Sequence, residues 1–382
     1  MQPLVPTTAE RRHTPLALVR QRVQAGRPLP FNVYRQDGTL LLASGQVVQS
    51  AQQLESLFER GSLVDLAELL PPPVDIAAAP RAELPRLWRE SVARVGEVLR
   101  QPQHDDFRGA LDAAAQPLQA LIQRDPDLAI FQVLRQEGHG LVQYGLAHAV
   151  HAAIVARLVA ARLGWPEPEL QRAFKAALTM NLGMLELQGQ LAQQTNPPTA
   201  EQRQKIHDHP LLSRQLLELA GIDDPVWLTA VEQHHEERGG GGYPAGLREV
   251  SELATLLHRA DVYTAKLSSR ATREAEAADQ AGREIFMQDP GHPVCAALVK
   301  EFGVYPPGCF VALASGETGV VVKRGSTVMS PIVAAMTNAY GAPLAEPVRR
   351  DTLLPLHAIV RVLQPRQMRA RFAPEQLVPL MA

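Results

Sequence analysis

Residues 234–247 read HHEERGGGGYPAGL, two adjacent histidines that run directly into four consecutive glycines and a Tyr-Pro pair. Imidazole nitrogens are common ligands of transition metals, and glycines let the backbone approach a bound group closely. His234 and His235 therefore predict a metal site beside a flexible loop, in preference to a packed core segment.

Four further segments carry residues of the same chemical kind, in order along the chain. They are YGLAH at 144–148, AALTMNLGM at 176–184, HP at 209–210 and ADVY at 260–263. Together with the histidine–glycine stretch they resemble the ordered motifs of the HD-GYP family, within the HD-domain metal-dependent phosphohydrolases. Ser268 and Arg270 fit a further turn motif of that family. The resemblance covers roughly residues 126 to 325 and implies a mainly α fold with a helical core of HD type.

The sequence before this core predicts a small α+β module over residues 1–75. Residues 31–49 place Asp37-Gly38 between two apolar runs, which predicts a hairpin with a tight turn. Residues 50–70 are expected to form a helix that ends before three consecutive prolines. The alanine- and proline-rich residues 71–80 are the expected linker.

Helical spacing of apolar residues continues from about residue 81. The segment 146–163 is apolar nearly all round, which predicts a buried helix. Thr199 and Gln202 form a capping-box pattern at the start of the helix that leads to His209, and Pro210 suits a first helical turn. Short β-rich runs separated by glycines follow Lys300. We expect a helical connector over 76–125, an HD-GYP-like helical domain over 126–300 and a β-rich subdomain over 301–382.

Composition narrows the class of partner and the compartment. The 382 residues are 46% hydrophobic with a formal net charge of −2, which favours a globular chain and disfavours nucleic acid polymers and membranes as partners. No signal peptide is recognisable, and the helix at 146–163 is short for a bilayer. With only Cys295 and Cys309, no disulfide framework is expected and a cytoplasmic location is predicted.

The resemblance implies five metal ligands: His148, His209, His234, His235 and Asp261. It also exposes a departure, because Met180 and Asn181 stand where the family has its namesake His-Asp pair, and Met184 replaces a lysine. Two cations about 3.5–4 Å apart need a bridging anion, and an amide carries no charge. We therefore expect at most one divalent transition metal, iron, manganese or zinc, and assign no catalytic residue. Two alternatives stay open: the histidines are hydrogen-bonded polar groups around an empty cavity, and Asp261 caps a helix.

The family's substrate is the dianion cyclic di-GMP, which the resemblance implies as the ligand. By the same resemblance Tyr243, Arg270 and Arg273 face the nucleotide; the alternative for the arginines is a solvated helix face. We expect a degenerate signalling protein with weak or no hydrolysis, which engages cyclic di-GMP and, by family analogy, diguanylate cyclase domains. The other hypotheses are an active phosphodiesterase and a purely structural scaffold.

Overall fold

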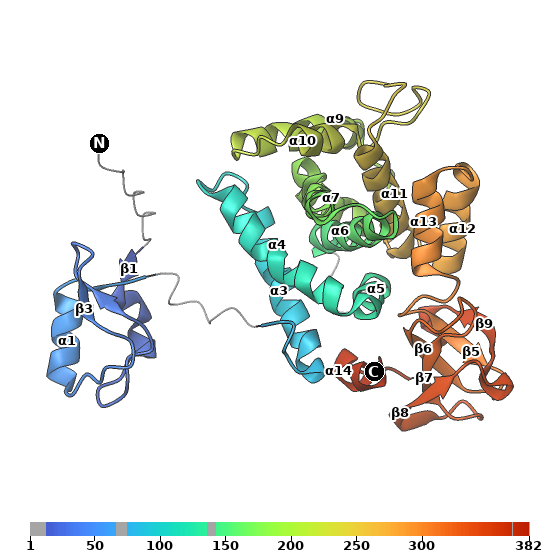
Figure 1. Cartoon of the computed structure of the whole chain (residues 1–382). Coiled ribbons are helices and arrows are strands. Elements are labelled where there is room, and N and C mark those ends of the chain that lie inside the picture. Colours follow the sequence, from blue (N-terminus) through green and yellow to red (C-terminus); the bar gives the residue numbers. More distant parts are fainter. Residues whose placement is uncertain (1–12, 66–74, 136–142, 369, 382) are drawn as a thin grey trace. The chain divides into compact units, whose positions relative to one another are not determined.

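The computed structural model describes residues 13–65, 75–135, 143–368 and 370–381, and the chain divides into two compact units, Met1–Asp75 and Ile76–Ala382 (Figure 1). Helices dominate the second unit, and each end of the chain carries one antiparallel sheet. The predicted mainly α fold with β structure at both ends is thus confirmed.

The first unit is a four-stranded antiparallel sheet with one helix. Gly38 has φ +81° and Asp37 accepts a hydrogen bond from the Thr39 N–H at 2.9 Å, so the predicted hairpin turn is present. The strand order is β1-β4-β2-β3. The elements are β1 (His13–Pro15), η1 (Leu16–Arg22), β2 (Val33–Tyr34), β3 (Leu40–Leu42), α1 (Ala51–Glu59) and β4 (Leu63–Asp65).

The helix expected over residues 50–70 is wrong beyond Glu59. Gly61 takes φ +62°, which ends the helix and reverses the chain. Leu63 and Val64 then pair with β1 and β2, and Val64 becomes fully buried in the small core of this unit. Residues 66–70 of the expected helix lie outside the described residues.

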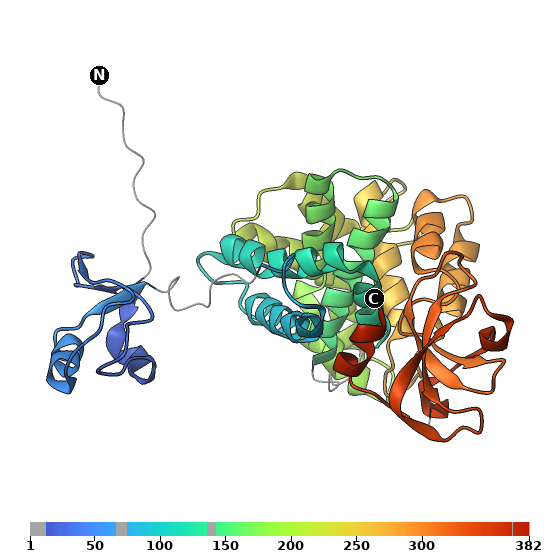
Figure 2. The same cartoon turned by 60° about the horizontal axis from the view of Figure 1, so that its bottom comes forward.

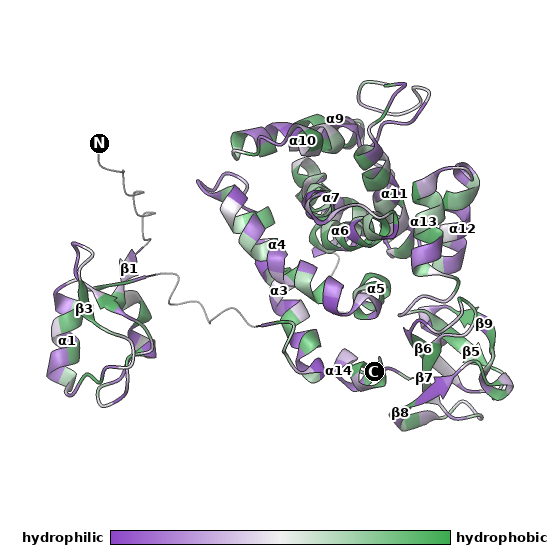
Figure 3. Cartoon of the chain, in the orientation of Figure 1, coloured by the Kyte–Doolittle hydropathy of each residue, from purple (hydrophilic) through white to green (hydrophobic). Residues whose placement is uncertain are grey.

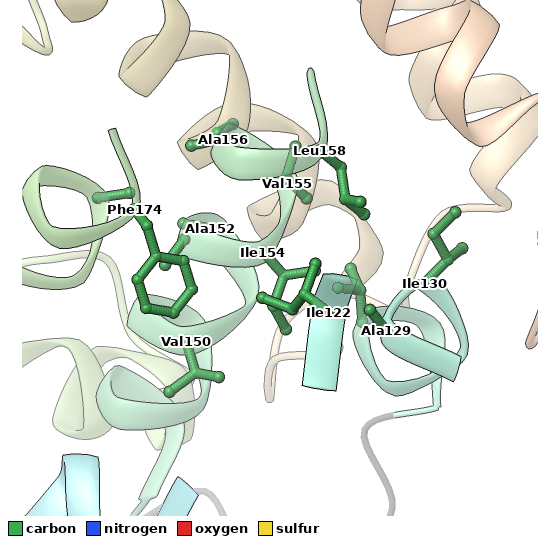
Figure 4. Packing of buried hydrophobic residues seen from close by; sticks show 14 of the residues in the cluster. Ile122, Ala129, Ile130, Val150, Ala152, Ile154, Val155, Ala156, Leu158 and Phe174 are labelled. Carbon is green, nitrogen blue, oxygen red and sulfur yellow. The ribbon is translucent and has the colours of Figure 1, made fainter. Parts of the chain in front are cut away.

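The second unit is built around α6 (Tyr144–Arg162), which is buried on all sides up to Ala160. Its apolar side chains pack against those of α4, α5 and α7, as Figure 4 shows for Ile154 beside Ile122 and for Phe174 beside Ala152. By length and composition α6 could cross a bilayer, but 94% of its apolar window is buried inside the fold. The other helices are α3 (Leu84–Leu99), α4 (Phe107–Arg124), α5 (Pro126–Leu134), α7 (Glu167–Thr179), α8 (Leu185–Gln193), α9 (Ala200–Leu219), α10 (Pro225–Gln233), α11 (Glu252–Leu267), α12 (Ala278–Gln288) and α13 (Pro293–Phe302).

The start of α9 was predicted correctly, but the place of Pro210 was not. Thr199 and Gln202 form a complete capping box. Pro210 lies inside the helix, which continues to Leu219. A first-turn position is excluded because the cap lies eleven residues earlier.

The second sheet has five antiparallel strands in the order β8-β7-β6-β5-β9. In Figure 3 the edge strand β8 is hydrophilic whereas the inner strands are mainly hydrophobic. Short β-rich runs were expected after Lys300, but the strands β7 and β8 were not foreseen. The strands are β5 (Phe310–Leu313), β6 (Thr318–Lys323), β7 (Ile332–Thr337), β8 (Pro343–Asp351) and β9 (Ile359–Leu363).

The sheet is fastened to the helices by charge and by apolar packing. Arg324 bonds Asp127 on α5 and Glu301 on α13. After the sheet, α14 (Pro374–Leu377) and η7 (Val378–Met381) return to the start of α3, where η7 contacts η2 (Arg81–Glu83) (Figure 2). One hydrophobic cluster consequently extends from Ile76 to Met381.

Candidate metal centre

Three histidines from two helices meet in the interior. His209 comes from α9, and His234 and His235 follow the last turn of α10. One ring nitrogen of each lies within 4.8 Å of the others, and His209 and His234 are at most 1% exposed. Three imidazole nitrogens at this separation can ligate one metal ion.

Backbone carbonyls fix which nitrogens of this triad are free. The Nδ1 atoms of His209 and His234 lie 2.6 Å from the carbonyl oxygens of Ile206 and Val231, so each Nδ1 carries the proton and donates it. Each Nε2 atom then carries a lone pair, and the two Nε2 atoms lie 3.1 Å apart. Two lone pairs at this distance repel unless a cation lies against both, and a backbone-bonded Nδ1 is the usual support of a metal-ligating histidine.

Pro210 explains why His209 takes this orientation. In an unbroken helix the N–H of residue 210 would donate to the carbonyl of Ile206, four residues earlier. Proline has no N–H, so that carbonyl is left to accept the proton on His209 Nδ1 instead. The His-Pro pair therefore sets the imidazole through the backbone of its own helix.

Electrostatics keep the triad neutral. Burial lowers the pKa of His209 to about 4 and that of His235 to about 3, although the nearby Asp261 raises both. Burial, together with the neighbouring imidazoles, also holds the pKa of His234 well below its usual value. A shared proton is thus disfavoured between the two lone pairs, whereas a soft divalent cation fits them.

A second cluster lies beside the triad and brings together residues far apart in the sequence. His148 Nε2 lies 2.7 Å from Asp261 Oδ1, and the Asn181 side-chain amide donates to the same oxygen at 3.2 Å. Asp261 is in the middle of α11, so the alternative that it caps a helix is wrong. Burial alone would raise the pKa of Asp261, but attraction to His148 and its hydrogen bond, with smaller effects of His235 and His234, hold that pKa well below its usual range.

Both clusters open into one cavity of about 210 Å³. Met184 lines it, whereas Met180 and His234 are fully buried and do not. Arg273 does not line it, since its guanidinium donates to the carbonyl of Ala265 and pairs with Glu276. The other residues singled out in the sequence that do line it are His148, Asn181, His209, His235, Tyr243, Asp261 and Arg270.

Aromatic and polar side chains form the outer wall of the cavity. Arg270 Nε donates to the Tyr144 hydroxyl at 3.0 Å, and Tyr243 stacks on the His235 ring with centroids 4.6 Å apart. Gln188 on α8 also lines the cavity, and its Oε1 is buried without a hydrogen-bond partner among the described residues. Sequence reasoning missed Gln188; its spacing of one helical turn from Met184 was the available signal.

A buried carboxylate shapes the glycine-rich loop. Glu236, only 3% exposed, accepts hydrogen bonds from the N–H groups of Ala245 and Leu247 at 2.7 and 2.9 Å. A Cβ on Gly242 would lie 2.3 Å from the Glu237 nitrogen, so this position needs glycine. Sequence reasoning took the Glu236 position only as part of a motif, and nothing in the pattern showed that the carboxylate turns inward to hold the loop.

Comparisons with known proteins agree with this geometry. An HD domain model matches residues 133–288. The chain is 29% identical over 204 residues to the cyclic di-GMP phosphodiesterase PA4108 of Pseudomonas aeruginosa, which covers 52% of this chain and 49% of that protein. It is 30% identical over 139 residues to the cyclic di-GMP phosphodiesterase response regulator RpfG of Xanthomonas campestris pv. campestris, covering 35% and 36%.

The chain thus spans about half or less of these relatives' length. A solved structure, Bd1817, an HDG"Y"P protein from Bdellovibrio bacteriovorus, aligns with a TM-score of 0.48 at 18% identity over 76% of this chain and 98% of the other. The HD match spans the helices that carry both histidine clusters, and HD-domain phosphohydrolases are typically metal-dependent. Residues 133–288 are therefore an HD domain, in a chain that resembles the HD-GYP family.

Proposed function

We propose that this chain is a cyclic di-GMP signalling protein that binds the dinucleotide in the histidine cavity and hydrolyses it weakly or not at all. Its two curated relatives, named as cyclic di-GMP phosphodiesterases, support the ligand class. The observation that carries the loss of activity is the hydrogen bond from the Asn181 amide to Asp261. One divalent transition metal, iron, manganese or zinc, would be held by His209, His234 and His235.

The number of metals follows from the number of anionic donors. Asp261 is the one carboxylate among the described residues that line the cavity. The side-chain N–H of Asn181 donates a hydrogen bond to that carboxylate, so Asn181 adds no negative charge to the site. Because two neighbouring divalent cations repel, a centre without a second bridging anion favours one ion over two. Met184 adds neither a ligand nor a cation for phosphate.

Nucleotide binding does not need the missing pair. Tyr144 holds the Nε side of Arg270, which leaves the outer N–H groups of the guanidinium free to fork onto a phosphate. Tyr243 presents a ring face beside His235 for stacking or a hydroxyl for hydrogen bonding. Arg273 is kept as an outer contact, although its present bonds would have to change.

We also propose a cellular location and a class of partner protein. We place the protein in the cytoplasm, which is supported by two cysteines, Cys295 and Cys309, that are both buried and unpaired. Diguanylate cyclase domains are proposed as partners at the loop that Glu236 holds in shape.

An active metal-dependent phosphodiesterase is the second candidate. It is favoured by the survival of three neutral imidazoles next to His148 and an ionised Asp261. Such an enzyme would open the cyclic dinucleotide to the linear dinucleotide or to GMP.

Metal analysis, calorimetry and product analysis on one preparation separate the candidates. We expect one metal ion per chain, binding of cyclic di-GMP, and no linear product after incubation with Mn²⁺ or Fe²⁺. His209→Ala should lose the metal, while His104→Ala, an exposed histidine elsewhere, should keep it. Two metals with product formation would establish the phosphodiesterase, and neither metal nor nucleotide binding would leave the scaffold hypothesis.

A further inference from the structure

A second cavity, of about 400 Å³, lies in the same unit and is separate from the histidine site. Its walls come from α3, α5, α6 and α14, with Trp88 and Phe131 as buried aromatic surfaces. Val92 and Val150 add further apolar wall. A cavity of this volume with a mainly apolar lining is of the size that accommodates a small organic molecule.

The charged groups of this cavity are biased toward one sign. Among the described residues that line it, three are arginines, Arg89, Arg100 and Arg135, against one glutamate, Glu97. Arg89 pairs with Glu375, and Arg135 lies over the Phe310 ring at 4.0 Å. With Arg89 paired, Arg100 and Arg135 against Glu97 still leave a local excess of positive charge, in a chain whose net charge is −2. Guanidinium groups beside an apolar wall favour a carboxylate joined to an apolar body.

We propose that this cavity binds an amphipathic organic acid, with its acyl or aromatic body against Trp88 and Phe131 and its carboxylate toward the arginines. The inference does not depend on the proposed function, because it uses no residue of the histidine cavity.

Helix α6 connects the new site to the histidine site. Ala147 and His151 line the organic-acid cavity, whereas Tyr144 and His148 of the same helix line the histidine cavity. His148 and His151, three residues apart on this helix, therefore line different cavities. A ligand that binds in one cavity and shifts α6 would change the affinity of the other cavity for its ligand. The effect is reciprocal, so each ligand would change the affinity for the other by the same factor.

Titration calorimetry with dodecanoate, 1-naphthaleneacetate and the neutral dodecan-1-ol tests the site. We expect one molecule of a carboxylate to bind per chain, more tightly than the alcohol. Binding of dodecanoate alone identifies an acyl body, and binding of naphthaleneacetate alone an aromatic one. If neither carboxylate binds, the proposal is overturned.

Variants on the exposed side of α3 localise the binding. Ala93→Trp fills the cavity from an exposed position and should abolish it. Arg100→Glu should weaken it about tenfold, the scale of one charge-assisted contact. Arg94→Glu makes the same charge change on the same helix outside the cavity and should leave the affinity unchanged. Unaltered binding in either of the first two variants contradicts the proposal, and circular dichroism confirms that each variant is folded.

The link through α6 has its own measurement. The affinity of the wild-type protein for Mn²⁺ is compared with and without saturating dodecanoate or naphthaleneacetate, whichever binds. A changed Mn²⁺ affinity supports communication between the cavities, and an unchanged one excludes it.

Discussion

Asn181→Asp is the substitution that bears most directly on the proposed loss of activity. It changes a neutral amide into a carboxylate without a change of size. The new carboxylate would lie about where the Asn181 amide nitrogen is now, 3.2 Å from Asp261 Oδ1. A hydrogen bond is thereby replaced by the repulsion of two like charges in a buried place.

The size of this effect follows from the distance. Two unit charges 3.2 Å apart interact by about 5 kcal/mol at an effective dielectric constant of about 20. At pH 7 the pair can relieve this by taking up one proton, which costs about 4 kcal/mol for a carboxyl that normally titrates near pH 4. We therefore expect the free energy of unfolding of the metal-free variant to fall by up to about 4 kcal/mol. For a domain of this size that lowers Tm by roughly 8 °C.

Divalent cations should reverse the loss, because the two carboxylates can then bridge a pair of ions. Thermal unfolding is measured in chelator and in excess Mn²⁺, with metal content determined on the same samples. Asn196→Asp, which adds the same charge at an exposed position, is the control and should behave as wild type. The reasoning is refuted if the variant matches wild type in chelator, or if the wild-type protein already carries two ions.

Three further outcomes are expected. Glu236→Ala leaves two loop N–H groups without their acceptor and should lower the stability of the loop by about 2 kcal/mol. Amide hydrogen exchange in the loop should therefore be faster than in wild type. Gly242→Ala should weaken metal binding through the displaced loop, while Gly241→Ala, whose Cβ meets only a side-chain oxygen at 3.4 Å, should not. Hydrogen bonds from Arg350 lower the pKa of Glu317 below its usual 4.5. That stabilisation is present above pH 4.5 and is lost as the pH falls through the lower folded-state pKa. Glu317→Gln should therefore lower the free energy of unfolding by about 1 kcal/mol at pH 6, and its difference from wild type should shrink as the pH falls below 4.5 in urea unfolding.

The residues gathered around the cavity were predictable because the motifs keep a fixed order on helices. His148 and Asp261 lie 113 positions apart, yet their side chains are bonded. The spacing of Gln188 from Met184 only hinted at its place in the cavity wall, and the role of Glu236 could not be foreseen, since it depends on which way a side chain turns inside a loop. Periodicity alone cannot supply that direction.

The sequence pattern predicted the wrong element where pairing with strands distant in the sequence decided the structure. The residues after Glu59 have helical spacing but become a strand, because β1 and β2 offer free edges. The strand β8 was missed because its apolar residues are few and it lies at a sheet edge. The four-part division of the chain stays a prediction.

The continuity of the main hydrophobic cluster bears on how this protein can be rearranged by evolution. The HD match ends at residue 288, yet α3 at one side and Met381 at the other contribute to the same interior. A gene fusion that kept only the matched segment would lack α3, nearly all of α5 and α13, and would expose the apolar surface of α6 that they cover. The segment that keeps this interior intact is therefore the whole second unit, Ile76–Ala382.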